Sequence, residues 1–394
     1  VNIGANDVAN SMATSVASGA LTIKKAVFVA AFFDVIGAIL VGAHVANTIR
    51  KGLVDPLHFA ETPNLFLYGM LAAVLGSALW VNIATYFKLP VSTTHSIVGG
   101  VLGFGLVSVG FAGIHWNIVI YIVLSWIISP VFGGLVSYVI FTIIRKSILE
   151  SRSPIEKAKK IGPFFVGIVV FVLVMAIICK GLKNLHLDFS FIESFFISCT
   201  VGAVAYFIGY ILLRKYKEKQ KDQYYQVEQM AIPLQILAAS VKAFSHGAND
   251  VANAIGPVAA IVAVIRTHEV SMQVPVSPWL LIVGGLGLGF GAYIWGHRVI
   301  ETVGEKITAI TPTRGFAAEF GTAVSVLTCT RLGMPVSTTH VAIGNIIGVG
   351  LARGVSAINL SVMKKIFAAW IISVPVAGLF SAALYGLFIF IFGV

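Results

Sequence analysis

Charged residues are scarce in this sequence. Only 11% of the 394 residues are Lys, Arg, Asp or Glu, whereas 58% are hydrophobic. A soluble domain carries about 25% charged residues, because a large apolar core needs a charged shell around it. Lipid removes this requirement. The composition therefore excludes an ordinary soluble protein and predicts an all-α, multi-pass protein of the plasma membrane, embedded in the lipid bilayer.

Cysteine is also scarce. The chain has three cysteines, an odd number, and they are not spaced like metal ligands. They lie in apolar stretches, which is typical of small buried hydrophobic residues. A disulfide framework and a zinc site are therefore disfavoured. The three residues are Cys179, Cys199 and Cys329.

The excess of basic residues, which gives a formal net charge of +11, follows a membrane pattern. Lys and Arg cluster at 145–160 and 214–221, between long apolar runs, and form no stripe interleaved with aromatic residues. Such clusters are typical of cytoplasmic loops that face anionic lipid. They predict that nucleic acid is not a partner, and that both clusters are cytoplasmic and joined by an apolar hairpin.

The apolar runs predict about twelve hydrophobic segments. Uninterrupted runs long enough for a bilayer, which needs about 20 residues, lie at 26–46, 65–87, 114–144, 163–179, 189–213, 278–295 and 367–392. Four further runs, at 1–21, 90–112, 232–265 and 335–352, are interrupted by Gly, Ser, Thr and Pro. Irregular backbone at membrane depth survives only inside protein or beside a wet cavity. These four runs therefore predict broken helices and re-entrant hairpins.

The strongest pattern in the sequence is an internal duplication. G-A-N-D-V-A-N occurs at 4–10 and 247–253, P-V-S-T-T-H at 90–95 and 335–340, and W-I-I-S at 126–129 and 370–373. The motifs keep the same order and nearly the same spacing in both copies. Three matched motifs in one order indicate that the chain consists of two related halves.

The duplication predicts a first transport repeat at 1–150, a central hairpin and cytoplasmic linker at 151–231, and a second transport repeat at 232–394. Five crossings in each repeat would give the two halves inverted topologies. Inverted repeats with broken helices are the architecture of secondary transporters that work by alternating access. The central segment is expected to act as a scaffold or as the contact of a homodimer.

Each repeat carries one Asp in its first motif, Asp7 and Asp250. An ionised Asp at the centre of a bilayer costs about 2.5–3.5 kcal/mol even on the lenient insertion scale, so each copy needs a partner. No Lys or Arg serves both, since Lys242 precedes only the second copy. A bound cation is the simplest partner, and a polar cluster that only packs helices is the alternative. Amides that share a helix face with these carboxylates are Asn6, Asn10, Asn249 and Asn253.

Three consecutive hydroxyl residues follow Pro-Val in each repeat. One of them would cap the following helix, and the helix start then offers free N–H groups and a dipole to an anion. Capping alone is the alternative, although one hydroxyl would suffice for it. The hydroxyl residues are Ser92, Thr93, Thr94, Ser337, Thr338 and Thr339. The glycines that follow have small-xxx-small spacing, which predicts close helix contact; they include Gly99, Gly103, Gly344 and Gly348.

Histidine ends each hydroxyl motif, at His95 and His340. These residues either relay protons or hydrogen-bond to hold the loops, and the second role is favoured. His246 adjoins only the second Asp, so it does not fit a symmetric mechanism. Gln235 lies too far from Asp250 along a straight helix to share its ligand.

The two kinds of group together suit a proton-bearing oxyanion. Monobasic phosphate can donate hydroxyl protons to Asp oxygens while its other oxygens accept from Ser and Thr. Sodium, which prefers oxygen ligands, would offset both negative partners, and this mutual dependence couples the two ions. The alternatives are a proton-coupled phosphate or metal-phosphate permease, and an anion channel. No nucleophile–base pair is repeated, which disfavours an enzyme.

The twin motifs, together with S-G-A-L-T at 18–22 and I-G-P at 255–257, resemble the inorganic phosphate transporter (PiT) family over the whole chain. The resemblance implies phosphate as the substrate, coupled to sodium in some members and to protons in others. Asn6 before Asp7 resembles the sodium-coupled branch, because some proton-coupled members have His before the first Asp.

By motif position, the resemblance also implies site residues. Those expected around phosphate are Asp7, Asn10, Ser92, Thr93, Thr94, Asp250, Asn253, Ser337, Thr338 and Thr339. Those expected to bind co-transported sodium are Asn6, Asp7, Asn249, Asp250, Thr94 and Thr339.

Overall fold

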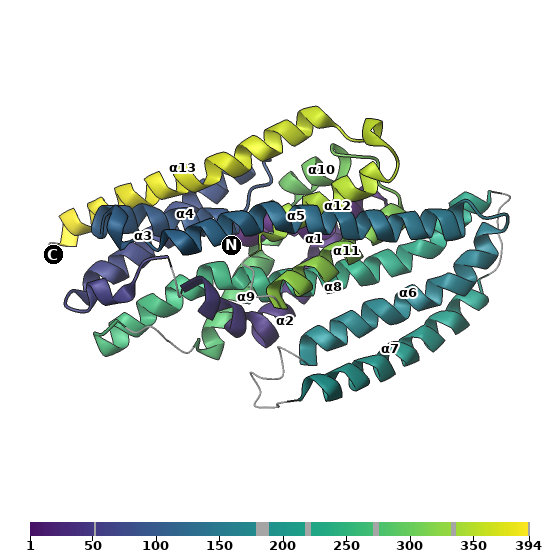
Figure 1. Ribbon diagram of the computed structural model, residues 1–394, viewed down its shortest axis with the longest axis horizontal. Coiled ribbons are helices and arrows are strands. Elements are labelled where there is room, and N and C mark those ends of the chain that lie inside the picture. The colour runs from purple at the N-terminus through teal and green to yellow at the C-terminus, as the bar shows by residue number, and fades with distance from the viewer. Residues whose placement is uncertain (51–52, 179–188, 217–221, 271–275, 332–335, 393–394) are drawn as a thin grey trace.

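The computed structural model describes residues 1–394 except 51–52, 179–188, 217–221, 271–275, 332–335 and 393–394. The described residues form helices and no strand (Figure 1). The helices are α1 (Asn2–Ala17), α2 (Ile23–Arg50), α3 (Pro63–Tyr86), α4 (Thr93–Ser108), α5 (Trp116–Ile144), α6 (Pro154–Ala176), α7 (Phe191–Arg214), α8 (Gln223–Thr267), α9 (Pro278–Trp295), α10 (His297–Glu305), α11 (Pro312–Arg331), α12 (Thr338–Leu351) and α13 (Leu360–Phe392).

Eight described helices are long and apolar enough to cross a membrane: α2, α3, α5, α6, α7, α8, α9 and α13. Each of the seven uninterrupted apolar runs coincides with one of these helices to within a few residues over its described part, which confirms that part of the sequence prediction. Helices α4 and α12 are apolar but shorter. The protein is therefore an all-helical, multi-pass membrane protein, with eight long apolar spans in its described part against the twelve segments expected.

The break expected in the run 232–265 was a wrong prediction. Helix α8 continues for 45 residues through Pro233 and Pro257. Each Pro removes one backbone donor, but α2, α11 and α6 pack around this helix, so neighbouring helices support it. Interruptions do occur before α4 and α12, where Ser92 and Ser337 have extended backbone.

Helices of the two repeats exchange partners. Helix α4 packs along α13, and its counterpart α12 packs along α5; likewise α3 packs on α13 and α11 on α5. Near the N-terminus, α1 packs against α9 and α10, and α2 lies along α8. The α6–α7 hairpin packs on itself and on α8 at one edge of the molecule (Figure 1). Each repeat is therefore completed by helices of the other.

The predicted glycine contacts are confirmed, and they explain how α4 and α12 approach their partners. A Cβ on Gly348 would lie 2.0 Å from the carbonyl oxygen of Gly134 in α5. A Cβ on Gly103 would lie 2.1 Å from the carbonyl oxygen of Gly378 in α13. Only glycine allows backbone contact this close, so the same device fixes both exchanged pairs.

Changing Gly348 to Ala is expected to destabilise the protein by about 1–3 kcal/mol, the usual cost of overpacking. The added methyl meets backbone, which cannot rotate away as a side chain can. Thermal unfolding in detergent measures the effect. Gly386→Ala in α13 is the matched control, because nothing lies within 4 Å of its Cβ position. Equal melting temperatures for the two variants would contradict this account of the helix contact.

Two of the three cysteines lie among the described residues. Cys329 is buried and Cys199 is half-buried, and both are free thiols. Cys179 lies outside the described residues, as do the basic residues at 217–221 and Pro335 of the second hydroxyl motif.

Candidate functional site

The two hydroxyl motifs form equivalent helix starts. Ser92 caps α4 by accepting a hydrogen bond from the backbone N–H of His95 at 3.1 Å. Ser337 caps α12 in the same way, accepting from the N–H of His340 at 3.3 Å. Both serines are buried. The two helices therefore begin inside the protein, with each capping Ser fixed by its own motif.

Each buried carboxylate meets the Thr that follows the capping Ser of its own repeat. The Thr93 hydroxyl donates to Asp7 Oδ2 at 2.8 Å. The Thr338 hydroxyl donates to Asp250 Oδ2 at 2.5 Å. Both Asp side chains are fully buried. The structure thus brings the G-A-N-D-V-A-N and P-V-S-T-T-H motifs together, although they are far apart in the sequence.

The asparagines link one repeat to the other. Asn10 Nδ2 donates to Thr339 Oγ1 at 2.8 Å, and Thr339 Oγ1 lies 3.2 Å from Asp7 Oδ1. In return, Asn253 Nδ2 donates to Thr93 Oγ1 at 3.2 Å and to Thr94 Oγ1 at 3.3 Å. The four motifs therefore form one continuous polar cluster in which each repeat contributes to the other's half.

Two acceptors of this cluster are left over. Asn10 Oδ1 and Asn253 Oδ1 are buried and have no hydrogen-bond partner among the described residues. A buried polar atom without a partner costs free energy. Because an amide oxygen can only accept, these two atoms suit a cation or a hydroxyl-bearing ligand, and they occupy equivalent positions in the two repeats.

The other two asparagines have different surroundings. Asn6 holds the loop before α4: its Nδ2 donates to Thr85 Oγ1 at 2.9 Å and to the Leu89 carbonyl at 3.0 Å, and its Oδ1 accepts from Val91 N–H at 3.1 Å. Asn249 donates to Asp250 Oδ1 at 2.8 Å. In this structure Asn6 positions the loop, whereas Asn249 contacts the carboxylate directly.

His246 makes the two halves chemically unequal. Its Nδ1 lies 2.9 Å from Asp34 Oδ1, and its Nε2 lies 2.9 Å from Asp250 Oδ2. All three side chains are buried. Ligand atoms of Asp7, His246 and Asp250 lie within 4.8 Å of one another, a grouping that could hold a cation. The expectation that His246 does not fit a symmetric mechanism is consistent with this geometry, since of the two motif carboxylates only Asp250 is in direct contact with its ring.

Sequence reasoning missed two carboxylates. Asp34 stands in the middle of an apolar run, and this alone could have marked it. Glu319 is fully buried in α11, where its Oε1 accepts from the hydroxyls of Thr14 at 2.5 Å and Ser15 at 2.7 Å. Gln235 Nε2 lies 3.5 Å from the same oxygen. Gln235 thus serves Glu319 and, as expected, not Asp250.

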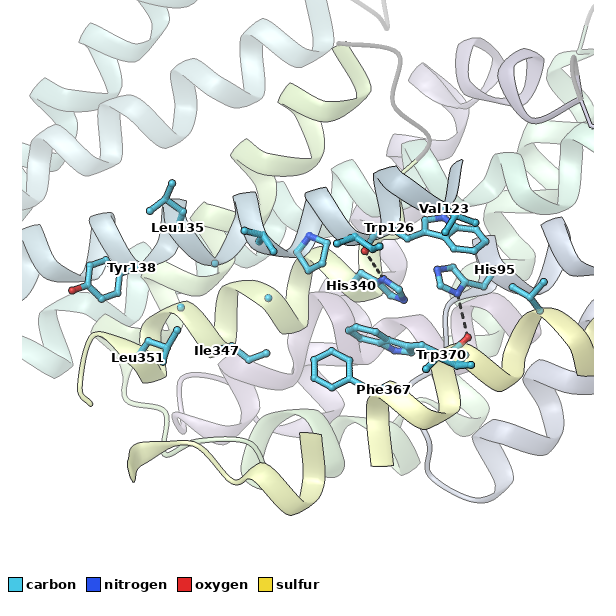
Figure 2. A pocket seen from close by; sticks show the side chains of 18 residues that line it. His95, Val123, Trp126, Leu135, Tyr138, His340, Ile347, Leu351, Phe367 and Trp370 are labelled. Atoms are coloured by element: carbon cyan, nitrogen blue, oxygen red, sulfur yellow. Dashed lines mark hydrogen bonds between the residues drawn. The ribbon is translucent and has the colours of Figure 1, made fainter. Parts of the chain in front are cut away.

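The motif histidines form a symmetric stack with the tryptophans of the two W-I-I-S motifs. The His95 ring stacks on Trp126 at 3.5 Å and its Nδ1 lies 3.4 Å from the Trp370 carbonyl. The His340 ring stacks on Trp370 at 3.6 Å and its Nδ1 lies 3.1 Å from the Trp126 carbonyl (Figure 2). The favoured role, holding the loops by hydrogen bonding, agrees with these contacts.

A small cavity lies beside the polar cluster. A cavity of about 10 Å³ lies between α1, α8, α11 and α12, which is room for about one water molecule or small ion. Its polar lining comprises Asn10, Ser11, Lys242, Ser245, His246, Thr322 and Thr338. A cavity of this size does not admit a phosphate ion.

Comparison with known proteins identifies the family of this chain. The model of the phosphate transporter family matches residues 3–381. A Pyrococcus abyssi protein named "Putative phosphate permease PYRAB14010" is 45% identical over 383 residues, covering 97% of this chain and 93% of its own. A Haemophilus influenzae protein named "Putative phosphate permease" is 38% identical over 387 residues, covering 97% of this chain and 92% of its own.

A solved structure described as "The sodium-dependent phosphate transporter" is 42% identical and superposes with a TM-score of 0.92, over 99% of this chain and 96% of that one. A match of this extent fixes both the fold and the family. The chain belongs to the phosphate transporter family.

Proposed function

We propose that this protein is a secondary transporter that imports inorganic phosphate together with sodium by alternating access. The observation that carries the proposal is the paired arrangement of two buried carboxylates, each hydrogen-bonded to a Thr at a buried helix start. The relationship to a protein described as a sodium-dependent phosphate transporter supports the choice of ions.

Phosphate would bind where α4 and α12 begin. Free N–H groups and hydroxyls at these helix starts would donate hydrogen bonds to phosphate oxygens. Asp7 or Asp250 would accept a hydrogen bond from a phosphate hydroxyl. The hydroxyls of Thr93 and Thr338 can rotate, so each can donate its hydrogen bond either to its Asp or to a phosphate oxygen. The proposed phosphate residues are Asp7, Asn10, Ser92, Thr93, Thr94, Asp250, Asn253, Ser337, Thr338 and Thr339.

Sodium would offset the negative charge of this site. Four buried carboxylates, Asp7, Asp34, Asp250 and Glu319, and a phosphate anion outnumber the two buried basic side chains, His246 and Lys242, so further positive charge is needed to keep them buried together. Hard cations bind oxygen ligands, and the residues proposed for sodium are Asn6, Asp7, Asn249, Asp250, Thr94 and Thr339. The unpartnered Oδ1 atoms of Asn10 and Asn253 lie in the same polar cluster. Sodium and phosphate then each lower the cost of binding the other, which is the coupling.

Alternating access requires the repeats to move. A cavity of about 10 Å³ is too small for phosphate, so the helix starts must separate to admit it. We propose that the two repeats have inverted topologies, that the segments before α4 and α12 are re-entrant, and that one set of exchanged helices rocks against the other in the plasma membrane. The α6–α7 hairpin at the edge would act as a scaffold or homodimer contact.

Replacing sodium by choline in a reconstituted uptake assay is expected to reduce phosphate accumulation to the level of empty liposomes. The measurement is uptake of radiolabelled phosphate into proteoliposomes at fixed pH, with and without an inward sodium gradient. Unchanged uptake in choline that follows an imposed proton gradient would establish proton coupling instead. Rapid equilibration without accumulation would indicate a channel.

A further inference from the structure

A lysine is buried in the middle of helix α8. Lys242 is 4% exposed and precedes His246 by four residues, so the two side chains share one face of the helix. Together with Asn10 and Thr338 of the polar cluster, Lys242 lines the cavity of about 10 Å³. A lysine is almost never fully buried unless its charge is paired. Its countercharge must therefore lie close by.

The countercharge is Glu319 of α11. Thr322, one turn after Glu319 on the same helix, lines the cavity together with Lys242, and the two opposite charges interact electrostatically. They are not in direct contact, because within the part of the chain that the structure describes Lys242 belongs to no ion pair. The two groups therefore balance each other at a distance, beside a cavity with room for about one water molecule.

The hydrogen-bond partners of Glu319 are donors. Its Oε1 accepts from the hydroxyls of Thr14 and Ser15 and lies 3.5 Å from Gln235 Nε2. The oxygen of the Gln235 amide is used elsewhere, since it accepts from the Ser18 hydroxyl at 2.8 Å. Glu319 Oε2 has no hydrogen-bond partner among the described residues. This set of partners suits an ionised carboxylate and leaves one oxygen for a cation.

Lys242 and a sodium ion would compete for this position. A sodium ion at Glu319 Oε2 would lie near the Lys242 side chain, and like charges repel strongly in a protein interior of low dielectric constant. The ammonium group is tethered to α8 and is always present, whereas sodium must be recruited from solution. The tethered cation therefore disfavours a bound one beside Glu319.

The buried charges show what the ammonium group contributes. Three of the four buried carboxylates gather around His246: two are in contact with its ring, and Asp7 belongs to the same group. The fourth, Glu319, is the one that Lys242 offsets. Without the ammonium group the buried region would gain one net negative charge, and one more cation from solution would be needed to balance it.

We propose that Lys242 is a built-in cation that takes the place of one sodium ion in the transport cycle. The chain would therefore move one sodium ion fewer per phosphate than it would without this side chain. The inference rests on the proposed coupling to sodium and adds to it a residue that sets the number of ions.

Thermal unfolding of the purified full-length protein in detergent tests the proposal without transport. Melting temperatures are compared in sodium chloride and choline chloride at equal ionic strength, without phosphate. In Lys242→Met, a sodium ion is expected to replace the lost ammonium group beside Glu319. At about ten times the Kd of this new site, the rise in melting temperature caused by sodium should exceed that of the wild type by about 2–4 °C.

Two control variants separate this site from a general effect of charge. Lys242→Met combined with Glu319→Gln removes one charge of each sign and should show the sodium response of the wild type. Lys24→Met removes a positive charge from an exposed position at the start of α2 and should also respond like the wild type. A wild-type response in Lys242→Met would overturn the proposal, as would an extra response that persists after Glu319→Gln is added. Failure of Lys242→Met to fold in sodium would overturn it too, because sodium would then not replace the ammonium group.

Proteoliposomes show whether the extra sodium ion is transported. Under a sodium gradient of about tenfold at zero membrane potential, the limiting accumulation of phosphate by Lys242→Met should exceed that of the wild type about tenfold, because each additional ion contributes one factor of the gradient. Equal accumulation, or loss of uptake, would contradict the proposal. The proposed function is judged separately: it fails if uptake by the wild type ignores sodium, whatever the melting temperatures of the variants show.

Discussion

Replacing either Asp7 or Asp250 by Asn is expected to abolish sodium-driven phosphate uptake. Asn keeps the shape of the side chain but loses the charge and turns one acceptor oxygen into a donor. Removing one partner of a buried charged pair costs about 3–5 kcal/mol, which corresponds to at least a hundredfold loss of binding. Binding of both proposed ligands would be weakened, because each carboxylate is proposed to contact both sodium and phosphate.

The variants should be compared in proteoliposomes at equal protein content, by initial uptake of labelled phosphate under a sodium gradient. Asp55→Asn is the matched control, because Asp55 caps a short 3₁₀ turn outside the polar cluster and Asn can cap equally well. We expect unequal effects at Asp7 and Asp250, because Asp250 Oδ2 is in direct contact with His246 Nε2, at 2.9 Å, whereas no such contact joins Asp7 to this imidazole. Wild-type uptake in both variants would remove the carboxylates from the mechanism.

The part of the site that repeats could be predicted from the sequence. Asp7 and Thr93 are far apart in the chain, yet the recurrence of both motifs in one order indicated a shared role before any contact was known. Their pairing, and that of Asp250 with Thr338, follows the symmetry of the duplication. The helices that carry long apolar runs were equally accessible, because hydrophobic length alone defines them.

The unrepeated part could not be predicted. Asp34 and Glu319 each obtain their partners from other helices, His246 on α8 and Thr14 on α1, and a linear sequence does not display such pairings. Neither Asp34 nor Glu319 has a counterpart in the other repeat's motifs, so the duplication does not mark them as site residues. The continuity of α8 was missed for a related reason. Glycine and proline lower the intrinsic helix propensity of this segment, but packing against three neighbouring helices outweighs that preference.

Exchange of helices between the repeats is the structural reason why one site forms from two halves. Asn10 reaches Thr339 of the other repeat, and Asn253 reaches Thr94. If the repeats packed each on its own, these side chains would lie in two separate clusters. The glycine contacts that draw α12 onto α5 and α4 onto α13 therefore help to assemble the polar cluster as well as the fold.

Disrupting the link between Asp34 and His246 is the second change with a large expected effect. In His246→Phe, the Asp34 carboxylate loses an imidazole 2.9 Å away while remaining fully buried. Leaving a buried charge unpaired costs about 3–5 kcal/mol, so we expect a strongly lowered melting temperature. Asp250 loses its neighbour in the same variant, and uptake should fall at least tenfold.

A double-mutant cycle distinguishes this direct link from two independent effects. Asp34→Asn and His246→Gln should each destabilise the protein, whereas Asp34→Asn with His246→Gln should cost less than the sum, because neither residue then leaves a charge unpaired. Uptake should stay low in the double variant, since the imidazole beside Asp250 is still missing. Additive losses of stability would show that Asp34 and His246 do not act as a pair. Recovery of uptake along with stability would show that His246 supports the fold alone and does not position Asp250 for its ligands.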